Sequence, residues 1–200
     1  MPEIVLVELD AELARTEPDP EIQDLIRASA GLNLALDYLP GSTTFDPLAW
    51  QPDAELASRI VWFDAFVTNV DRTPRNANML VWHRKLWLID HGAALYFHHN
   101  WPDFMARSTG AFPMVKDHVL LGFANALEAA DEKMSALITP DVIADVVGLI
   151  PDDWLEDDPV FSGAAPKAQH RDAYRQHLVN RLTPPRAFAQ EAIRARAANL

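Results

Sequence analysis

The chain has 200 residues, of which 49% are apolar and 23% are charged, so it holds enough apolar material for the core of one ordinary domain. Its net charge of −12 argues against a nucleic-acid or anionic-membrane partner, because phosphate-rich surfaces would repel it. The sequence contains no cysteine, which excludes disulfides, thiolate metal sites and cysteine nucleophiles.

The N-terminal third predicts two strands around a helix. Residues 3–9 (EIVLVEL) are rich in β-branched side chains and predict a strand, and no basic segment precedes them as in a signal peptide. Residues 18–30 predict a helix, and the alternating leucines of residues 31–39 predict a strand that ends at the turn Pro40-Gly41. No apolar run approaches the roughly 18 residues of a membrane span, so we expect a cytoplasmic protein with no membrane partner.

The middle of the chain predicts a buried helix followed by a β-hairpin. Residues 43–52 are expected to form a loop, and Asp53 is a good N-cap for a helix over residues 54–70. The apolar runs 79–83 and 86–90 predict two strands of a hairpin. The remainder is predicted to be helical apart from a loop with a short helical turn at residues 151–163, and the fold class is therefore α+β and mainly helical.

Polar side chains flank the predicted hairpin. Asp71 and Asn76 precede it and Asp90 follows it, and because a hairpin returns the chain to its starting point, we expect Asp90 to lie near Asn76. Carboxylate and amide oxygens suit Mg²⁺, which leaves its other positions to water and phosphates. Asp71 is then free to orient or deprotonate a hydroxyl group, and together these features indicate phosphoryl transfer.

The same residues carry a resemblance to a known family. Asp71 and Asn76 match the D-x-x-x-x-N of the kinase catalytic loop, and Asp90-His91-Gly92 stands where D-F-G would stand. The stretch VDRTPRNANMLVWHRKLWLIDHGAALY resembles the HipA-like kinase family, and the resemblance covers most of residues 31–100 and, more loosely, the helical remainder. It implies ATP as phosphoryl donor, a hydroxyl acceptor, Asp71 as the catalytic aspartate, and Asn76 and Asp90 as Mg²⁺ ligands.

The resemblance also implies a two-lobed organisation and further nucleotide contacts. Residues 1–41 would be a remnant of the small lobe with its hinge strand, and residues 42–200 a helical kinase-like C-terminal lobe forming one compact unit. Leu39 in the hinge and Arg72 or Arg75 in the loop would contact the nucleotide. For the two arginines the alternatives are a role in holding the loop, or exposure as plain surface charges.

Two features depart from the family pattern. None of the seven glycines lies within five residues of another, and all four lysines follow Asp71, so a glycine-rich loop and a nucleotide lysine are missing. We therefore expect impaired activity in this chain, whether it is part of a longer kinase or a natural fragment. The alternatives are a pseudokinase-like binding module without turnover and, less favoured, a Mg²⁺-dependent phosphohydrolase.

Several nearby side chains have more than one interpretation. Asn78 rivals the preferred asparagine as a metal ligand. Asp64, on the predicted buried helix, either bonds the backbone of the loop or is a solvated acid. His91, His98 and His99 invite a zinc interpretation, but surface or hydrogen-bonded histidines are commoner, and His91 is expected to pack against the metal-binding loop.

Overall fold

The computed structural model describes residues 3–155 and 160–199, and it is mainly helical. Helices account for 50% of the residues and strands for 11%, which confirms a mainly helical α+β composition. The chain divides into two compact units, one formed by Met1–Thr43 with Val81–Trp87 and the other by Thr44–Leu80 with Leu88–Leu200. The assignment of residues 1–41 as a small-lobe remnant and of residues 42–200 as a kinase-like lobe stays a prediction.

The first unit is built on a pair of antiparallel strands. Strands β1 (Ile4–Leu9) and β2 (Gly31–Leu36) pair from Ile4 opposite Leu36 to Leu9 opposite Gly31, as the β-branched and alternating segments predicted. Between them lie the 3₁₀ helix η1 (Ala11–Thr16) and helix α1 (Pro20–Ala28). Consecutive β1 side chains from Ile4 to Val7 are each at least 40% exposed, so neither face of this strand is covered.

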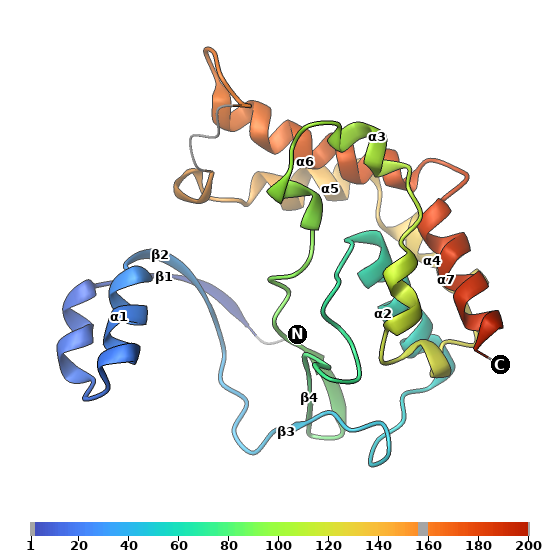
Figure 1. The fold of residues 1–200 in the computed structure, drawn as a ribbon, viewed down its shortest axis with the longest axis horizontal. Coiled ribbons are helices and arrows are strands. Elements are labelled where there is room, and N and C mark those ends of the chain that lie inside the picture. Colours follow the sequence, from blue (N-terminus) through green and yellow to red (C-terminus); the bar gives the residue numbers. More distant parts are fainter. Residues whose placement is uncertain (1–2, 156–159, 200) are drawn as a thin grey trace. The chain divides into compact units, whose positions relative to one another are not determined.

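The core of the second unit forms where helix α2 packs against helices α4 and α7. Helices α2 (Ala54–Phe66), α4 (Leu127–Leu137) and α7 (Ala187–Ala198) lie side by side (Figure 1). Asp53 caps α2 as predicted, because its side chain accepts a hydrogen bond from the backbone N–H of Leu56. Trp62 is fully buried, with its ring 5.1 Å from that of Phe188.

A second group of helices surrounds α6 (Pro166–Leu182), which packs against α3 (Phe104–Ser108) and α5 (Pro140–Gly148). Thr139 caps α5 by accepting a hydrogen bond from the backbone N–H of Val142, and Pro140 begins the helix. The remaining helical segments are short 3₁₀ turns: η2 (Tyr96–His99), η3 (Pro113–Asp117), η4 (Leu121–Phe123) and η5 (Asp152–Trp154). The predicted loop at residues 151–163 begins with η5, and part of it lies outside the described residues.

The predicted hairpin is present as strands β4 (Met79–Trp82) and β5 (Lys85–Leu88). The expectation that residues 43–52 form only a loop is wrong in one detail, since Thr43–Thr44 form a short strand, β3, and the sheet has the order β3-β4-β5. His83 and Arg84 make the tight turn with positive φ angles of 47° and 60°.

No helix in residues 3–155 and 160–199 combines the length and the apolar character that a membrane crossing requires.

Candidate active site

The candidate site is a tight loop, residues 69–78, between α2 and β4. The backbone N–H groups of Thr73 and Asn76 each donate to the carbonyl of the other residue, at 3.0 and 3.1 Å, which closes the loop on itself. Upstream, the side chain of Asn69 accepts a hydrogen bond from the backbone N–H of Asp71 at 3.2 Å. The loop therefore presents the Asp71 carboxylate from a backbone that local hydrogen bonds define.

Two asparagine amides orient the Asp71 carboxylate. Its Oδ2 atom accepts hydrogen bonds from Nδ2 of Asn76 at 2.7 Å and from Nδ2 of Asn78 at 3.2 Å. Because both amides face Asp71 with their nitrogens, their oxygens remain available as ligands for another group. The structure brings Asp71 and Asn76 together, and it adds Asn78 to the same cluster.

A buried ion pair joins Arg72 of the loop to Asp64 of α2. The Nε atom of Arg72 donates to Oδ2 of Asp64 at 2.5 Å, and both side chains are 0% exposed. The alternatives of an exposed Arg72 and a solvated Asp64 are thus wrong. Removing either partner would leave an uncompensated charge in the interior, so the pair fixes the loop to α2.

Asp64 is the centre of a wider hydrogen-bond network. It also accepts from Nδ2 of Asn69 at 3.1 Å and from Nε2 of His118 at 3.0 Å, while Nδ1 of His118 accepts from the backbone N–H of Leu120. Burial by itself would raise the pKa of Asp64, but the His118 hydrogen bond and the charge of Arg72 outweigh it and hold the pKa below its ordinary value. The carboxylate is therefore ionised at neutral pH.

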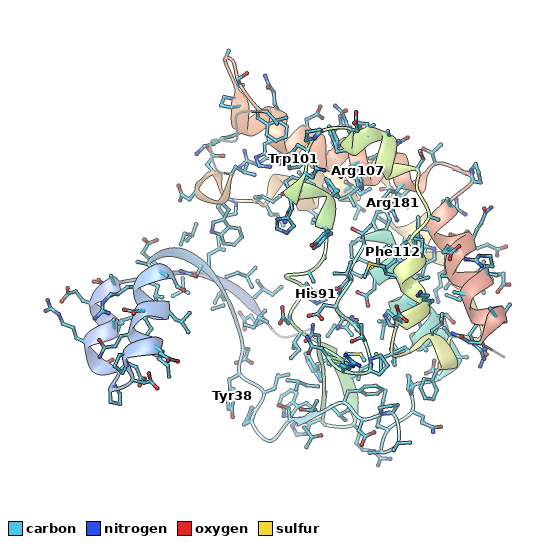
Figure 2. The ribbon with its side chains drawn as sticks, viewed as in Figure 1. Tyr38, His91, Trp101, Arg107, Phe112 and Arg181 are labelled. Carbon is cyan, nitrogen blue, oxygen red and sulfur yellow. The ribbon has the colours of Figure 1, made fainter. Side chains whose placement is uncertain are left out.

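Arg72 also connects the two sides of the hairpin. Its Nη1 atom donates to the carbonyl of Asn78 at 2.6 Å, and its Nη2 atom lies 3.3 Å from Nδ1 of His91, which must act as the acceptor (Figure 2 labels His91). Partial desolvation of the ring and the Arg72 charge lower the pKa of His91. The backbone N–H of Ile89 donates to the carbonyl of Asn78 at 3.0 Å, which confirms that the chain doubles back after residue 78.

Asp90 directly follows this return. It adopts a left-handed conformation with φ 47°, which aspartate tolerates better than most residues, and its exposed carboxylate accepts a hydrogen bond from the backbone N–H of Gly92 at 3.3 Å. The carboxylate of Asp90 and the amide oxygens of Asn76 and Asn78 are hard oxygen donors, so these residue types fit a magnesium ion chemically.

His98 and His99, which follow Asp90 in the chain, make contacts with other side chains. Among the described residues, no group of three or more histidines, aspartates and glutamates lies close enough together to hold a metal ion. His98 instead contacts the hydroxyl of Tyr174 at 3.1 Å and Nε2 of His99 at 3.2 Å. The magnesium hypothesis concerns one carboxylate, that of Asp90, and one amide, that of Asn76, and it stays a prediction.

The other two predicted nucleotide contacts are Arg75 and Leu39. Arg75 is exposed at the tip of the loop, and Leu39 is buried in the first unit, where it is 5% exposed. Their contact with a nucleotide stays a prediction. Sequence reasoning missed His118 altogether, because the histidine meets Asp64 across 54 positions of the chain and no local pattern marks it.

Comparison with known proteins gives one match. A family model described as HipA-like kinase matches residues 1–183, which include the motif-bearing span 31–100. No curated protein and no solved structure matches the chain significantly.

Proposed function

The chain belongs to the HipA-like kinase family, and on this premise we propose that it transfers the γ-phosphoryl group of ATP to a hydroxyl acceptor with the help of Mg²⁺. The observation that carries the proposal is the return of the hairpin onto the loop. The bond between Ile89 and Asn78 brings the Asp90 segment beside the loop that holds Asp71. This is the juxtaposition that phosphoryl transfer requires of an acceptor-orienting group and a metal-binding group.

In the proposed mechanism Asp71 accepts a hydrogen bond from the hydroxyl of the acceptor and aligns its oxygen for attack. The amides of Asn76 and Asn78 hold the Asp71 carboxylate in one orientation, which reduces the entropy lost on reaching the transition state. Asn76 and Asp90 are the proposed Mg²⁺ ligands. When bound, Mg²⁺ neutralises the charge on the phosphate oxygens of the nucleotide.

Arg72 is proposed to act on the loop rather than on a phosphate. Its guanidinium is buried and already occupied by Asp64, by the carbonyl of Asn78 and by His91. Of the two arginines, Arg75 is exposed and therefore the better candidate for a phosphate contact. Since all four lysines follow Asp71, we propose that the chain binds ATP weakly.

The proposal is tested by thermal denaturation with ATP and Mg²⁺ and by transfer of labelled phosphate. We expect ATP with Mg²⁺ to raise the melting temperature of the wild type and of the control Asp145→Ala, which alters an exposed acid on α5, but not of Asp90→Ala. Asp71→Asn should retain binding and lower transfer roughly 10²- to 10⁴-fold, as loss of a general base does. Equal stabilisation of wild type and Asp90→Ala would contradict the proposed metal role.

A binding module without turnover is the second candidate, and the missing nucleotide lysine favours it. Mg²⁺-dependent ATP binding with no phosphorylated product would support this candidate over the kinase. Release of inorganic phosphate without any phosphorylated acceptor would instead indicate the less favoured phosphohydrolase.

A further inference from the structure

A cavity of about 240 Å³ opens in the second unit beside the start of the candidate loop. Its walls come from the residues just before Asp71, from the segment after Asp90, and from α3 and α6. They combine apolar side chains with two arginines and a histidine. The lining residues are Thr68, Val70, Tyr96, Phe97, Arg107, Ala111, Phe112, Met114, His177 and Arg181. Arg107, Phe112 and Arg181 lie near one another in Figure 2.

The first unusual feature of this cavity is a buried cation without a carboxylate. Arg181 is 3% exposed, and its guanidinium donates to four backbone carbonyls, those of Ala65, Phe66, Ser108 and Gly110. Within the described part of the chain it forms no ion pair. Burial lowers the pKa of Arg181 to about 10, so it stays protonated at neutral pH and its charge is uncompensated.

The second feature is a buried histidine with one free nitrogen. Nδ1 of His177 lies 3.0 Å from the carbonyl of Phe104 and must donate to it, which leaves Nε2 unprotonated. Nε2 is buried and has no hydrogen-bond partner among the described residues. Burial, followed by the charges of Arg181 and Arg107, lowers the pKa of His177 to about 4. The ring is therefore neutral in the empty cavity.

The third feature is a strained threonine. Thr68 has φ 55°, a conformation that β-branched residues rarely adopt and that clusters at functional sites. Its hydroxyl is buried and, within residues 3–155 and 160–199, has no hydrogen-bond partner. Thr68 immediately precedes Asn69, whose side chain holds the backbone of Asp71. The strain thus lies three residues from the proposed catalytic aspartate.

We propose that this cavity binds a carboxylate-bearing side chain of the phosphoryl acceptor, an assignment that rests on the proposed kinase function. The carboxylate would accept from the Thr68 hydroxyl and offset part of the positive charge of Arg181 and Arg107, while its methylene groups contact Phe97 and Phe112. One proton from solvent is shared between His177 Nε2 and the carboxylate on binding. A monoanion with two oxygens fits better than phosphate, because four hydrogen bonds to carbonyls already occupy most of Arg181.

The groups that face His177 set the pH dependence of binding. Arg107 on α3 and Arg181 on α6 both oppose protonation of the ring in the empty cavity. A bound carboxylate would instead favour protonation of the His177 ring. The affinity of the cavity for the carboxylate should therefore increase as the pH falls from 7.5 to 5.5, the range in which the ring without a bound carboxylate remains neutral.

The test uses the full chain without ATP and observes the ¹⁵N resonance of the His177 ring. The probe is N-acetylglutamate amide, and N-acetylglutamine amide is its neutral isostere. We expect a saturable shift with the glutamate probe alone. Thr68→Val keeps the branched shape and should weaken binding about tenfold, whereas Thr16→Val in η1 should have no effect. Arg107→Gln should also weaken binding.

Three outcomes would overturn the inference: no saturable shift, an equal response to the glutamine probe, or a response to inorganic phosphate but not to the glutamate probe. Because ATP is absent, the result is independent of the transfer assay. Glutamate binding without any phosphoryl transfer would refute the kinase function and its acceptor but leave the carboxylate site. Transfer without glutamate binding would refute the inference alone.

Discussion

At the scale of single residues, Arg72 organises the candidate site. Its side chain contacts Asp64 on α2, the carbonyl of Asn78 at the start of the hairpin, and His91 after it. The sequence indicated only that Arg72 lies inside the loop, and left open whether it is exposed. Nothing in the local pattern reveals that a charged side chain is buried, because its partners are 6, 8 and 19 residues away.

Replacement of Arg72 by methionine is expected to lower the free energy of unfolding by about 3–5 kcal/mol, because it leaves the Asp64 carboxylate buried without its main counter-ion. The matched control is Arg75→Met in the same loop, where the side chain is exposed and the expected change is within about 0.5 kcal/mol. Urea denaturation at neutral pH measures both. Similar losses for the two variants would contradict the buried role of Arg72.

The depressed pKa of Asp64 predicts acid sensitivity of the same network. Since the folded-state pKa lies below the ordinary value of 3.8, the contribution of Asp64 to stability is complete well above that pH and is lost as the pH falls through the folded pKa. The stability difference between wild type and Asp64→Asn should therefore be smaller at pH 3 than at pH 6. A difference that does not narrow at pH 3 would exclude this linkage.

At the scale of elements, the sequence predicted most of the secondary structure. The Asp53 cap, the Thr139 cap with Pro140, and the apolar runs of the hairpin each encode a local boundary, and the structure has helices and strands at those places. What the sequence could not predict depends on long-range packing. His118 reaches Asp64 and Arg181 reaches α2 only after the chain has folded, and no periodic pattern precedes either residue.

The elements are expected to differ in local stability. Helix α2 buries its side chains against α4 and α7, whereas β1 exposes consecutive apolar residues on both faces. A strand pair with little buried area opens easily. Hydrogen exchange followed by mass spectrometry should show slower exchange in residues 54–66 than in residues 4–9 and 31–36. Equal protection of the strand pair and the helix would contradict this ranking.

At the scale of the whole molecule, the match to the HipA-like kinase family covers residues 1–183, which comprise the first compact unit and the second up to the segment before α7. The two motifs on either side of the hairpin were enough to suggest this family. The spacing of Asp71, Asn76 and Asp90 is the one expected of a group that orients a hydroxyl beside two Mg²⁺ ligands. Thr68, His177 and Arg181 had no such signal. Their cavity depends on where α6 lies against α2 and the loop, which is a property of the folded molecule.

The loop and the hairpin return are proposed to form one metal–nucleotide site. Manganese replaces magnesium in such oxygen sites and broadens the NMR signals of nearby nuclei. Titration of the ¹⁵N-labelled chain with ATP and Mn²⁺ should broaden the amide signals of Asn76, Asn78, Asp90 and Gly92 and leave those of α7 sharp. If these four signals stay sharp while ATP and Mn²⁺ saturate the chain, or if broadening appears only elsewhere, the loop and the hairpin return do not form a metal–nucleotide site.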